Sequence, residues 1–255
     1  MDELVILVTG ASGGIGAATA LRLAEHSPRY TVKAIALHYN SNCELCEKVA
    51  TKVHDINPKI LVSVFQADMA RHEDIDRLYR EVTRVFGPIN VLFANAGTTM
   101  GASGPTGTLD TVSLETFEAT WRVNTLAPYQ LVQLVVPSMI AHKFGRVIFN
   151  SSVAALTGGV VGPHYASSKS ALHGMMHYLA MRHAKDGITF NAVAPALIED
   201  TLMLPKDEGN EIMRSKIPVG RLGRPDEIAG VVQVMIENGY ISNKVWAVDG
   251  GWHPM

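Results

Sequence analysis

Three side chains in the second half of the chain could together move a proton to or from a carbonyl oxygen. Tyr165 and Lys169 stand four positions apart in a helical stretch, so they lie one turn apart on one helix face. A tyrosine hydroxyl titrates at about pH 10 in water, and a nearby ammonium lowers that pKa. Ser152 follows a short apolar run and could polarise the same oxygen. Taken alone, however, a Tyr–Lys pair at this spacing is structural more often than catalytic.

A glycine-rich turn near the N-terminus has the character of a phosphate-binding loop. The segment Thr9-Gly10-Ala11-Ser12-Gly13-Gly14-Ile15-Gly16 links a strand-like run directly to a helical stretch. Glycines let the backbone approach a pyrophosphate, whose charge then meets the helix N-terminus. The spacing differs from the usual dinucleotide fingerprint, and any tight turn favours glycine. Its place after the first strand nevertheless favours a cofactor site over a plain turn.

The end of the second predicted strand bears on the choice of cofactor. An acidic residue here would bind the adenosine ribose diol and select NAD. The turn at 37–42 has no acidic residue before Glu44, and it has no Arg or Lys to attract a 2′-phosphate. Neutral hydrogen bonds could come from Ser12, Asn40, Ser41 and Asn42. We expect NADP(H) in preference to NAD(H).

Short apolar runs alternate with longer helical patterns along the whole chain. The runs are near-continuous, which is typical of parallel strands covered on both faces. The order predicts a single-domain α/β protein over residues 1–255, with a doubly wound parallel sheet (a Rossmann fold of about seven strands) and helices on both faces. The predicted strands are Leu4–Thr9, Thr31–Leu37, Ile60–Gln66, Asn90–Ala94, Arg146–Asn150, Ile188–Val193 and Lys244–Val248. The predicted helices are Ile15–His26, Glu44–Ile56, Ile75–Phe86, Leu114–His142, Tyr165–Lys185 and Pro225–Asn238.

One polar segment interrupts this alternation. Glu199–Pro218 carries Pro205, Gly209 and Pro218, and we expect it to form a substrate lid over the carboxyl edge of the sheet, where such folds bind ligands. Its apolar residues could line a substrate pocket or simply pack within the lid. These residues are Leu202, Met203, Leu204, Pro205 and Met213.

The composition argues against nucleic acid and membrane partners. The 22 Lys and Arg nearly balance the 24 Asp and Glu, leaving a net charge of −2. The longest apolar stretches, Leu4–Val8 and Leu131–Ala141, are shorter than the roughly 20 residues of a membrane helix. Cys43 and Cys46 are the only cysteines, so we expect a reducing compartment, the cytoplasm.

Two patterns resemble metal sites but lack further ligands. Cys43 and Cys46 have a zinc-site spacing, and no second cysteine pair exists. His173 and His177 lie one helical turn apart, but Gly174 stands where a zinc-protease helix has its glutamate. We expect no metal, and we interpret the two histidines as surface or interface residues.

Five motifs in register resemble those of the short-chain dehydrogenase/reductase family, and particularly its 3-oxoacyl-carrier-protein-reductase-like branch. They are Thr9-Gly10-x-x-x-Gly14-x-Gly16, Asn95-Ala96-Gly97, Asn124, Ser152 and Tyr165-x-x-x-Lys169. Ser152 precedes Tyr165 by thirteen positions, as in the family. The resemblance covers residues 4 to 251. The chain departs from the family at Ala196, where glycine is usual, and at Asp200, where threonine is common.

The resemblance implies a role for each matched residue. Tyr165 would be the general acid in reduction and the base in oxidation, Lys169 would hold the nicotinamide ribose and lower the pKa of Tyr165, and Ser152 would orient the substrate oxygen. Asn124 would organise a water that continues the proton relay behind Lys169. Asp68 would contact adenine, Asn95 to Gly97 would line the adenosine ribose, and Pro195 to Thr201 would meet the carboxamide. The full set of implied cofactor contacts is Gly10, Ser12, Gly14, Ile15, Gly16, Asn40, Ser41, Asp68, Met69, Asn95, Ala96, Gly97, Tyr165, Lys169, Pro195, Ile198 and Thr201.

The first hypothesis is therefore an NAD(P)-dependent oxidoreductase that moves a hydride between NADP(H) and a carbonyl or secondary alcohol, such as a 3-oxoacyl thioester or another ketone. The alternative is a non-catalytic dinucleotide-binding protein that keeps the fold, although such a protein has no chemical need for the Asn–Ser–Tyr–Lys set. A sugar-nucleotide epimerase or dehydratase is disfavoured, because those chains usually run longer and begin with a different glycine spacing. The resemblance also implies a homo-oligomer, a dimer or tetramer, formed through the helices at 114–142 and 165–185. Arg122, Lys143 and Arg146 are too few to indicate a docking surface for a carrier protein.

Overall fold

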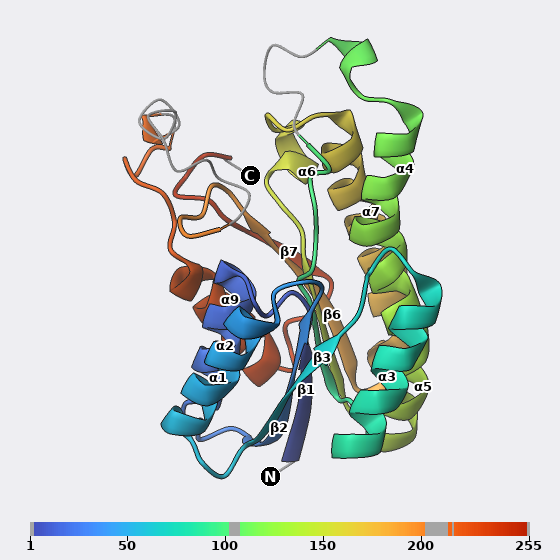
Figure 1. Cartoon of the computed structure of the whole chain (residues 1–255), viewed down its shortest axis with the longest axis vertical. Helices are drawn as coiled ribbons and strands as arrows, with labels where there is room; N and C mark the ends of the chain where they lie inside the picture. The colour runs from blue at the N-terminus through green and yellow to red at the C-terminus, as the bar shows by residue number, and fades with distance from the viewer. Residues whose placement is uncertain (1–2, 102–107, 202–213, 216, 254–255) are drawn as a thin grey trace.

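The seven strands form one parallel sheet, as predicted (Figure 1). The computed structural model describes residues 3–101, 108–201, 214–215 and 217–253. The strand order is β3-β2-β1-β4-β5-β6-β7, so the order reverses between β1 and β4, as in doubly wound folds. The strands are β1 (Glu3–Val8), β2 (Thr31–Tyr39), β3 (Leu61–Gln66), β4 (Val91–Ala94), β5 (Gly145–Asn150), β6 (Ile188–Pro195) and β7 (Lys244–Val248).

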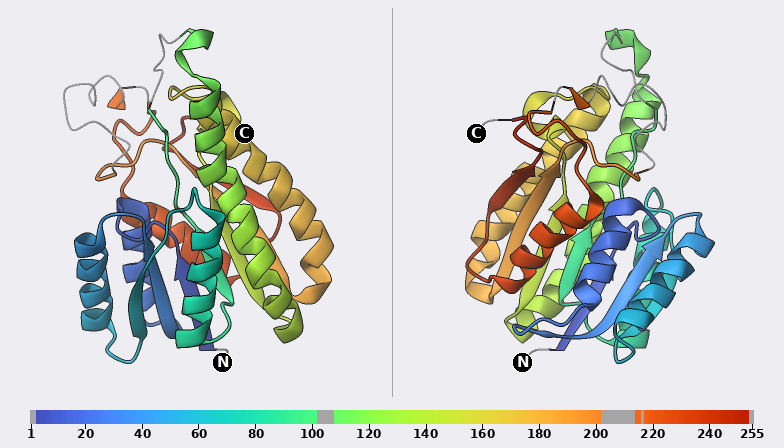
Figure 2. Two further views of the ribbon diagram at one scale, coloured as in Figure 1. Left: turned by 45° about the vertical axis from the view of Figure 1, so that its right-hand side comes forward. Right: turned by 90° about the vertical axis from the view of Figure 1, so that its left-hand side faces the viewer.

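Helices cover both faces of the sheet, and each face has its own core (Figure 2). Successive residues of β1 alternate between them: Leu4 and Ile6 belong to one core, and Val5 and Leu7 to the other. One face carries α1 (Gly14–Ala24), α2 (Cys43–Ile56) and α9 (Pro225–Glu237). The other carries α3 (His72–Phe86), α4 (Leu114–Trp121), α5 (Ala127–His142) and α7 (Pro163–His183). The predicted fold class is confirmed.

The helix predicted over 114–142 is not continuous. A π-helical turn, η2 (Arg122–Leu126), separates α4 from α5, and the backbone N–H of Ala127 donates to the carbonyl of Arg122 five residues earlier. Pro128 has no N–H to offer the carbonyl of Asn124 four residues earlier, so the α-helical bond cannot form there. Such π turns are frequent at functional sites, and this one contains Asn124.

Several boundaries also differ from the prediction. β2 continues to Tyr39 and β6 to Pro195. α7 begins at Pro163, because proline suits the first turn of a helix, so Tyr165 lies inside the first turn rather than at its start. Within the described residues, η1 (Leu109–Thr111) and α6 (Ala154–Thr157) were not predicted, and the predicted helix over 165–185 ends in a 3-10 turn, η3 (Ala184–Asp186).

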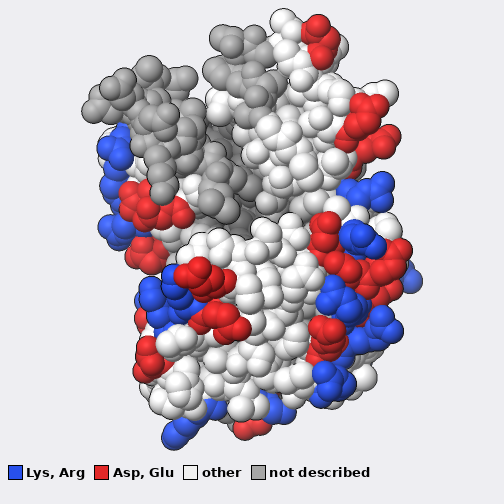
Figure 3. Space-filling model, in the orientation of Figure 1, with Lys and Arg blue, Asp and Glu red and all other residues white. Residues whose placement is uncertain are grey.

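Most of the predicted lid cannot be compared with the structure. Of Glu199–Pro218, residues 202–213 and 216 lie outside the described residues, and with them Leu202, Met203, Leu204, Pro205 and Met213. No helix within the described ranges is both long and apolar enough to span a membrane. Acidic and basic side chains are intermixed on the face shown in Figure 3. Arg146, one of the three basic residues considered for a docking surface, is buried, and its Nε donates to the carbonyl of Ile236 at 3.0 Å.

Candidate active site

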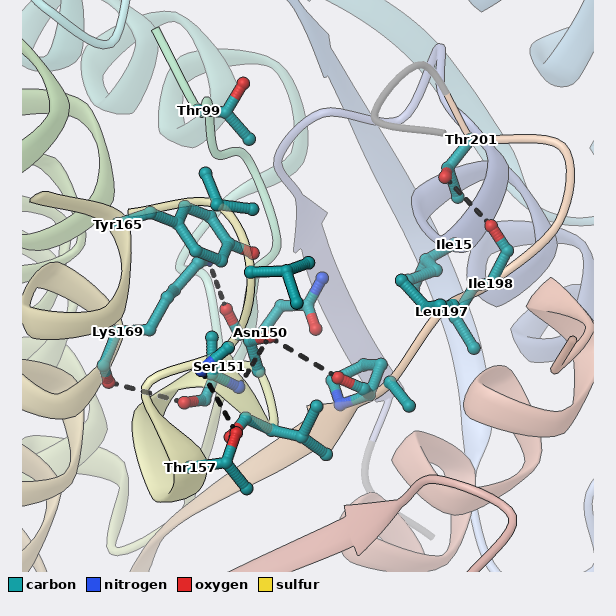
Figure 4. A pocket seen from close by; sticks show the side chains of 18 of the residues that line it. Ile15, Thr99, Asn150, Ser151, Thr157, Tyr165, Lys169, Leu197, Ile198 and Thr201 are labelled. Atoms are coloured by element: carbon teal, nitrogen blue, oxygen red, sulfur yellow. Dashed lines mark hydrogen bonds between the residues drawn. The ribbon is translucent and has the colours of Figure 1, made fainter. Parts of the chain in front are cut away.

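A pocket at the carboxyl edge of the sheet brings the predicted catalytic residues together. Tyr165 and Lys169 lie on one side of it, and Ile198 and Thr201 lie on the other (Figure 4). The carboxyl ends of parallel strands meet at this edge, which is why residues far apart in the chain converge here. The predicted site residues that line the pocket are Ile15, Asn95, Ser152, Tyr165, Lys169, Pro195, Ile198 and Thr201.

The two hydroxyls predicted to be catalytic line the same pocket. Ser152, just after β5, lies near enough to Tyr165 on α7 to lower the pKa of its phenol. The backbone N–H of Ala154 donates to Ser152 Oγ at 3.1 Å, which helps to fix the serine rotamer. Tyr165 is 7% exposed. Burial raises the pKa of its phenol, and the nearby Ser152 offsets this rise only in part.

Lys169 is buried next to this pair. Its Nζ donates to the carbonyl of Asn150, the last residue of β5, at 2.6 Å. Burial lowers the pKa of Lys169 from 10.5 to about 8. Burial raises the pKa of Tyr165 in this arrangement, and the expected lowering of that pKa by Lys169 stays a prediction. Nζ lies 5.8 Å from the centre of the Tyr165 ring and is bonded to the Asn150 carbonyl instead.

Asn124 is held rigidly behind Lys169. Its Nδ2 donates to the carbonyl of Thr98 and its Oδ1 accepts from the N–H of Thr98, both at 2.8 Å. Nδ2 also donates to Ser168 Oγ at 3.0 Å. Gly97 lies between the two groups: a Cβ there would be 3.1 Å from Lys169 Nζ and 3.2 Å from Asn124 Oδ1. The π turn therefore places Asn124 beside the lysine, while the water relay stays a prediction.

The glycine-rich turn is tied to the end of β4. Thr9 Oγ1 accepts from the backbone N–H groups of Asn95 and Ala96 at 2.9 Å each. In return, Asn95 Nδ2 donates to the carbonyls of Thr9 and Gly10 at 2.8 and 3.1 Å. The side chain of Asn95 thus braces the turn, and its predicted contact with the adenosine ribose is not tested here.

The first turn of α1 suits a bound pyrophosphate. Gly13 precedes the helix without any side-chain cap, and the first turn itself carries no acidic residue, which favours an anion at its N–H groups. A Cβ at Gly16 would lie 2.3 Å from the carbonyl of Gly10, so the turn can close against the helix only with glycine at this position. These residues fit the diphosphate of a nicotinamide dinucleotide.

Comparison with known proteins identifies the family. Residues 4–211 match the family model described as short chain dehydrogenase. The chain belongs to this family. It is 32% identical to the 3-oxoacyl-[acyl-carrier-protein] reductase of Thermotoga maritima over 98% of each chain. It is also 32% identical to the acetoacetyl-CoA reductase of Allochromatium vinosum, over 97% of each chain, and to the L-rhamnose 1-dehydrogenase (NADP(+)) of Thermoplasma acidophilum, over 96% of this chain and 94% of that one.

The carboxamide side of this short-chain dehydrogenase departs from the family pattern as the sequence indicates. Asp200 has a positive φ of 56°, which aspartate tolerates better than most residues do. Thr201, the next residue, lines the pocket, and its hydroxyl donates to the carbonyl of Ile198 at 2.9 Å. The structure therefore brings Thr201 to the expected place, and its contact with a cofactor stays a prediction.

The adenosine side is mostly exposed. Asn40 and Ser41 are exposed after β2, whereas Asn42 is already engaged, because its Oδ1 accepts from the N–H of Leu45 and caps α2. Asp68 follows β3, and its Oδ1 accepts from the N–H of Ala70 at 2.9 Å. Ser12 is half-buried, Met69 is buried, and none of these positions contradicts the predicted cofactor contacts.

Sequence reasoning missed the role of His38. This residue is 1% exposed. Its Nδ1 accepts from the N–H of Gly10 at 3.0 Å, so the proton on Nε2 donates to the carbonyl of Ala67 at 3.0 Å. A neutral ring is required for this pair of bonds, and burial lowers the pKa of His38 to about 4. A histidine at the end of an apolar run gives no local signal that its ring is buried, neutral and hydrogen-bonded to a glycine 28 positions away.

Two further histidines contact the site region. His173 Nε2 lies 2.7 Å from the hydroxyl of Ser151, the neighbour of Ser152, a contact that the expectation of a surface or interface residue did not include. His164 Nε2 donates to the carbonyl of Thr99, which lines the pocket, at 2.8 Å. His177 Nδ1 lies 2.6 Å from Asn243 Oδ1, and it therefore serves a different contact from His173.

Replacing His38 with asparagine should make folding less sensitive to acid. Below pH 6.5 the unfolded chain protonates this histidine, whereas the folded chain does so only near pH 4, so the free energy of unfolding falls as the pH decreases between these values. From about pH 7 to about pH 5 this amounts to about 2 kcal/mol. His38→Asn keeps an acceptor for the Gly10 N–H and cannot titrate, so this part of the loss should disappear in urea unfolding. The matched control is His26→Asn at an exposed position, and an equal loss in both variants would contradict the assignment.

Proposed function

We propose that the protein transfers a hydride between NADP(H) and a carbonyl or secondary alcohol, with Tyr165 as the proton donor or acceptor. Membership of the short-chain dehydrogenases makes it an NAD(P)-dependent oxidoreductase of carbonyl or alcohol groups. The observation that carries the proposal is that Ser152, Tyr165 and the buried Lys169 line one pocket at the carboxyl edge of the sheet.

Each predicted catalytic side chain has its own role at the substrate oxygen. The nicotinamide, when bound, supplies or accepts the hydride. Ser152 donates a hydrogen bond to the oxygen and stabilises the charge that develops on it. Because burial raises the pKa of Tyr165, the phenol is protonated at neutral pH and can act as the acid in reduction. Lys169 and Asn124 then provide the route by which the proton is replaced.

Tyr165→Phe should lower kcat by about 100- to 10,000-fold, because the variant lacks the proton that Tyr165 transfers. Stabilisation by the cofactor, read as a rise in Tm, should persist, since a ligand bound only to the folded state raises its stability. Tyr240→Phe, at an almost fully exposed tyrosine, is the matched control. Undiminished turnover by Tyr165→Phe would disprove the role. A wild-type chain that gained stability from the cofactor but reduced or oxidised nothing would favour the non-catalytic alternative.

A preference for NADP(H) is part of the proposal. It is supported by the neutral, exposed Asn40 and Ser41 after β2, where no acidic residue stands before Glu44 to repel a 2′-phosphate. One relative, the L-rhamnose 1-dehydrogenase of Thermoplasma acidophilum, carries NADP(+) in its name.

The lid over 199–218 and a single domain over 1–255 remain predictions. A cytoplasmic location also remains a prediction, with which the free thiols of Cys43 and Cys46 are compatible.

NADPH should raise the Tm more than NADH does at equal concentration. Asn40→Asp should reverse this order, because a carboxylate beside the ribose repels a 2′-phosphate and accepts from the free diol. The matched control is Asn238→Asp, which adds the same charge away from the turn after β2. At this position, at the end of α9, the carboxylate can still accept from the N–H of Tyr240. A larger effect of NADH on the wild-type chain would contradict the preference.

We also infer a homo-oligomer that forms through α5 and α7. Large apolar side chains on or next to these helices are exposed, Tyr129 by 44%, Tyr178 by 66% and Met181 by 76%, and such side chains are typical of contact surfaces. Met181→Arg should therefore reduce the mass measured by sedimentation. Tyr240→Arg, outside these helices, should not. A wild-type chain that sediments as a monomer would refute the inference.

A further inference from the structure

The pocket beside the catalytic pair is largely apolar. Apart from Lys169, no described residue that lines it carries a charged side chain. Thr157 offers a hydroxyl, but that group already donates to the carbonyl of Val153 at 3.0 Å and accepts from the N–H of Gly159 at 3.1 Å. The apolar lining residues next to Ser152 and toward the C-terminus are Val153, Ala154, Val160, Val161, Leu197 and Trp252.

The first part of this lining is attached to the catalytic helix. α6 starts two residues after Ser152 and leads into the turn that carries Val160 and Val161. Ser170 on α7 donates from its hydroxyl to the carbonyl of Ala155 in α6 at 2.9 Å. Because Ser170 directly follows Lys169, this part of the wall keeps a fixed position relative to the reacting groups.

Trp252 reaches the pocket from the other end of the chain. The carboxylate of Asp249 accepts from the backbone N–H groups of Gly251 and His253 at 2.9 and 2.8 Å. The N–H of Trp252 donates to the carbonyl of Asp249 at 3.3 Å, and the N–H of Val219 donates to that of Gly250 at 3.1 Å. These hydrogen bonds to Asp249, which we call the Asp249 clasp, hold the turn after β7 in place, and this turn carries Trp252 into the pocket lining.

We propose that this wall binds an apolar substituent of the substrate and that Trp252 is the residue that selects it. The inference rests on the proposed oxidoreductase function and specifies its substrate class: a ketone or secondary alcohol whose groups next to the reacting carbon are aliphatic or aryl and carry neither a charge nor further hydroxyls. A sugar would leave hydroxyls without partners against this wall, each costing about 1–3 kcal/mol. An anionic group would lose its hydration without an ion pair. An apolar substituent, in contrast, binds favourably against an aromatic wall, because the contact buries apolar surface of both partners.

Three alcohols of different chemistry test the proposal as oxidation substrates with NADP(+) and with NAD(+). They are racemic 1-phenylethanol, which is apolar, L-rhamnose, which is polyhydroxylated, and 3-hydroxybutyrate, which is anionic. The wild-type chain should oxidise 1-phenylethanol with kcat/KM about tenfold or more above the other two. Trp252→Ala should raise KM for 1-phenylethanol about tenfold with little change in kcat, as expected for lost binding of the unreacting substituent.

Two further variants separate recognition from folding. Trp252→Phe keeps an aromatic wall and should restore most of the affinity. Asp249→Asn loses one charged acceptor of the clasp and should raise KM in the same direction as Trp252→Ala, but less. The rise in Tm caused by NADPH should match that of the wild-type chain in all three variants, because Trp252 and Asp249 lie outside the glycine-rich turn.

The outcomes distinguish this inference from the proposed function. Preferential oxidation of L-rhamnose or 3-hydroxybutyrate, abolished by Tyr165→Phe, would uphold the function and overturn the substrate class. An equal effect of Trp252→Ala on all three alcohols would overturn the selective role of Trp252. No oxidation of any of them with either cofactor would overturn both the substrate class and the function.

Discussion

The ammonium of Lys169 is almost completely buried, and the geometry of the active site depends on how that charge is accommodated. Removing an amine from water is costly unless hydrogen bonds replace its hydration. Burial lowers the pKa of Lys169 to about 8, and the carbonyl of Asn150 accepts from Nζ at 2.6 Å. Because Asn150 ends β5, this bond ties α7 to the carboxyl edge of the sheet.

The same hydrogen bond fixes the positions of the Tyr165 and Ser152 hydroxyls. Tyr165 lies one turn before Lys169 on α7, and Ser152 lies two residues after Asn150, so one hydrogen bond brings both hydroxyls to the pocket. Their enclosure raises the pKa of the phenol rather than lowering it. The site is therefore set up with a protonated tyrosine, which is the form needed to donate to a developing alkoxide.

A proline and a histidine adapt the regular fold around this centre. Pro128 prevents the α-helical bond to Asn124, and the resulting π turn places that side chain beside Lys169. On the cofactor side, His38 holds the first glycine of the phosphate-binding turn through a neutral ring. In both cases hydrogen bonds satisfy the buried side chain: Asn124 bonds to Thr98 and Ser168, and His38 bonds to Gly10 and Ala67.

The sequence by itself determined the fold class, and it predicted the side chains that we propose as catalytic. Near-continuous apolar runs indicate strands covered on both faces, and the spacing of Tyr165 and Lys169 is a property of a single helix. It also placed Ser152 and the glycine-rich turn at strand ends, where a parallel sheet gathers its ligands. Each of these features is visible in a local pattern, but it took the register of five motifs along the chain to point to a catalytic role.

Only the tertiary structure decided which distant groups act on those residues. The partner of Lys169, the bracing of Gly10 by a histidine 28 positions away, and the presence of Trp252 in the pocket all depend on which strand ends lie side by side. The burial of the Tyr165 phenol is decided in the same way, because no local pattern encodes it, and this burial raises the pKa of the phenol.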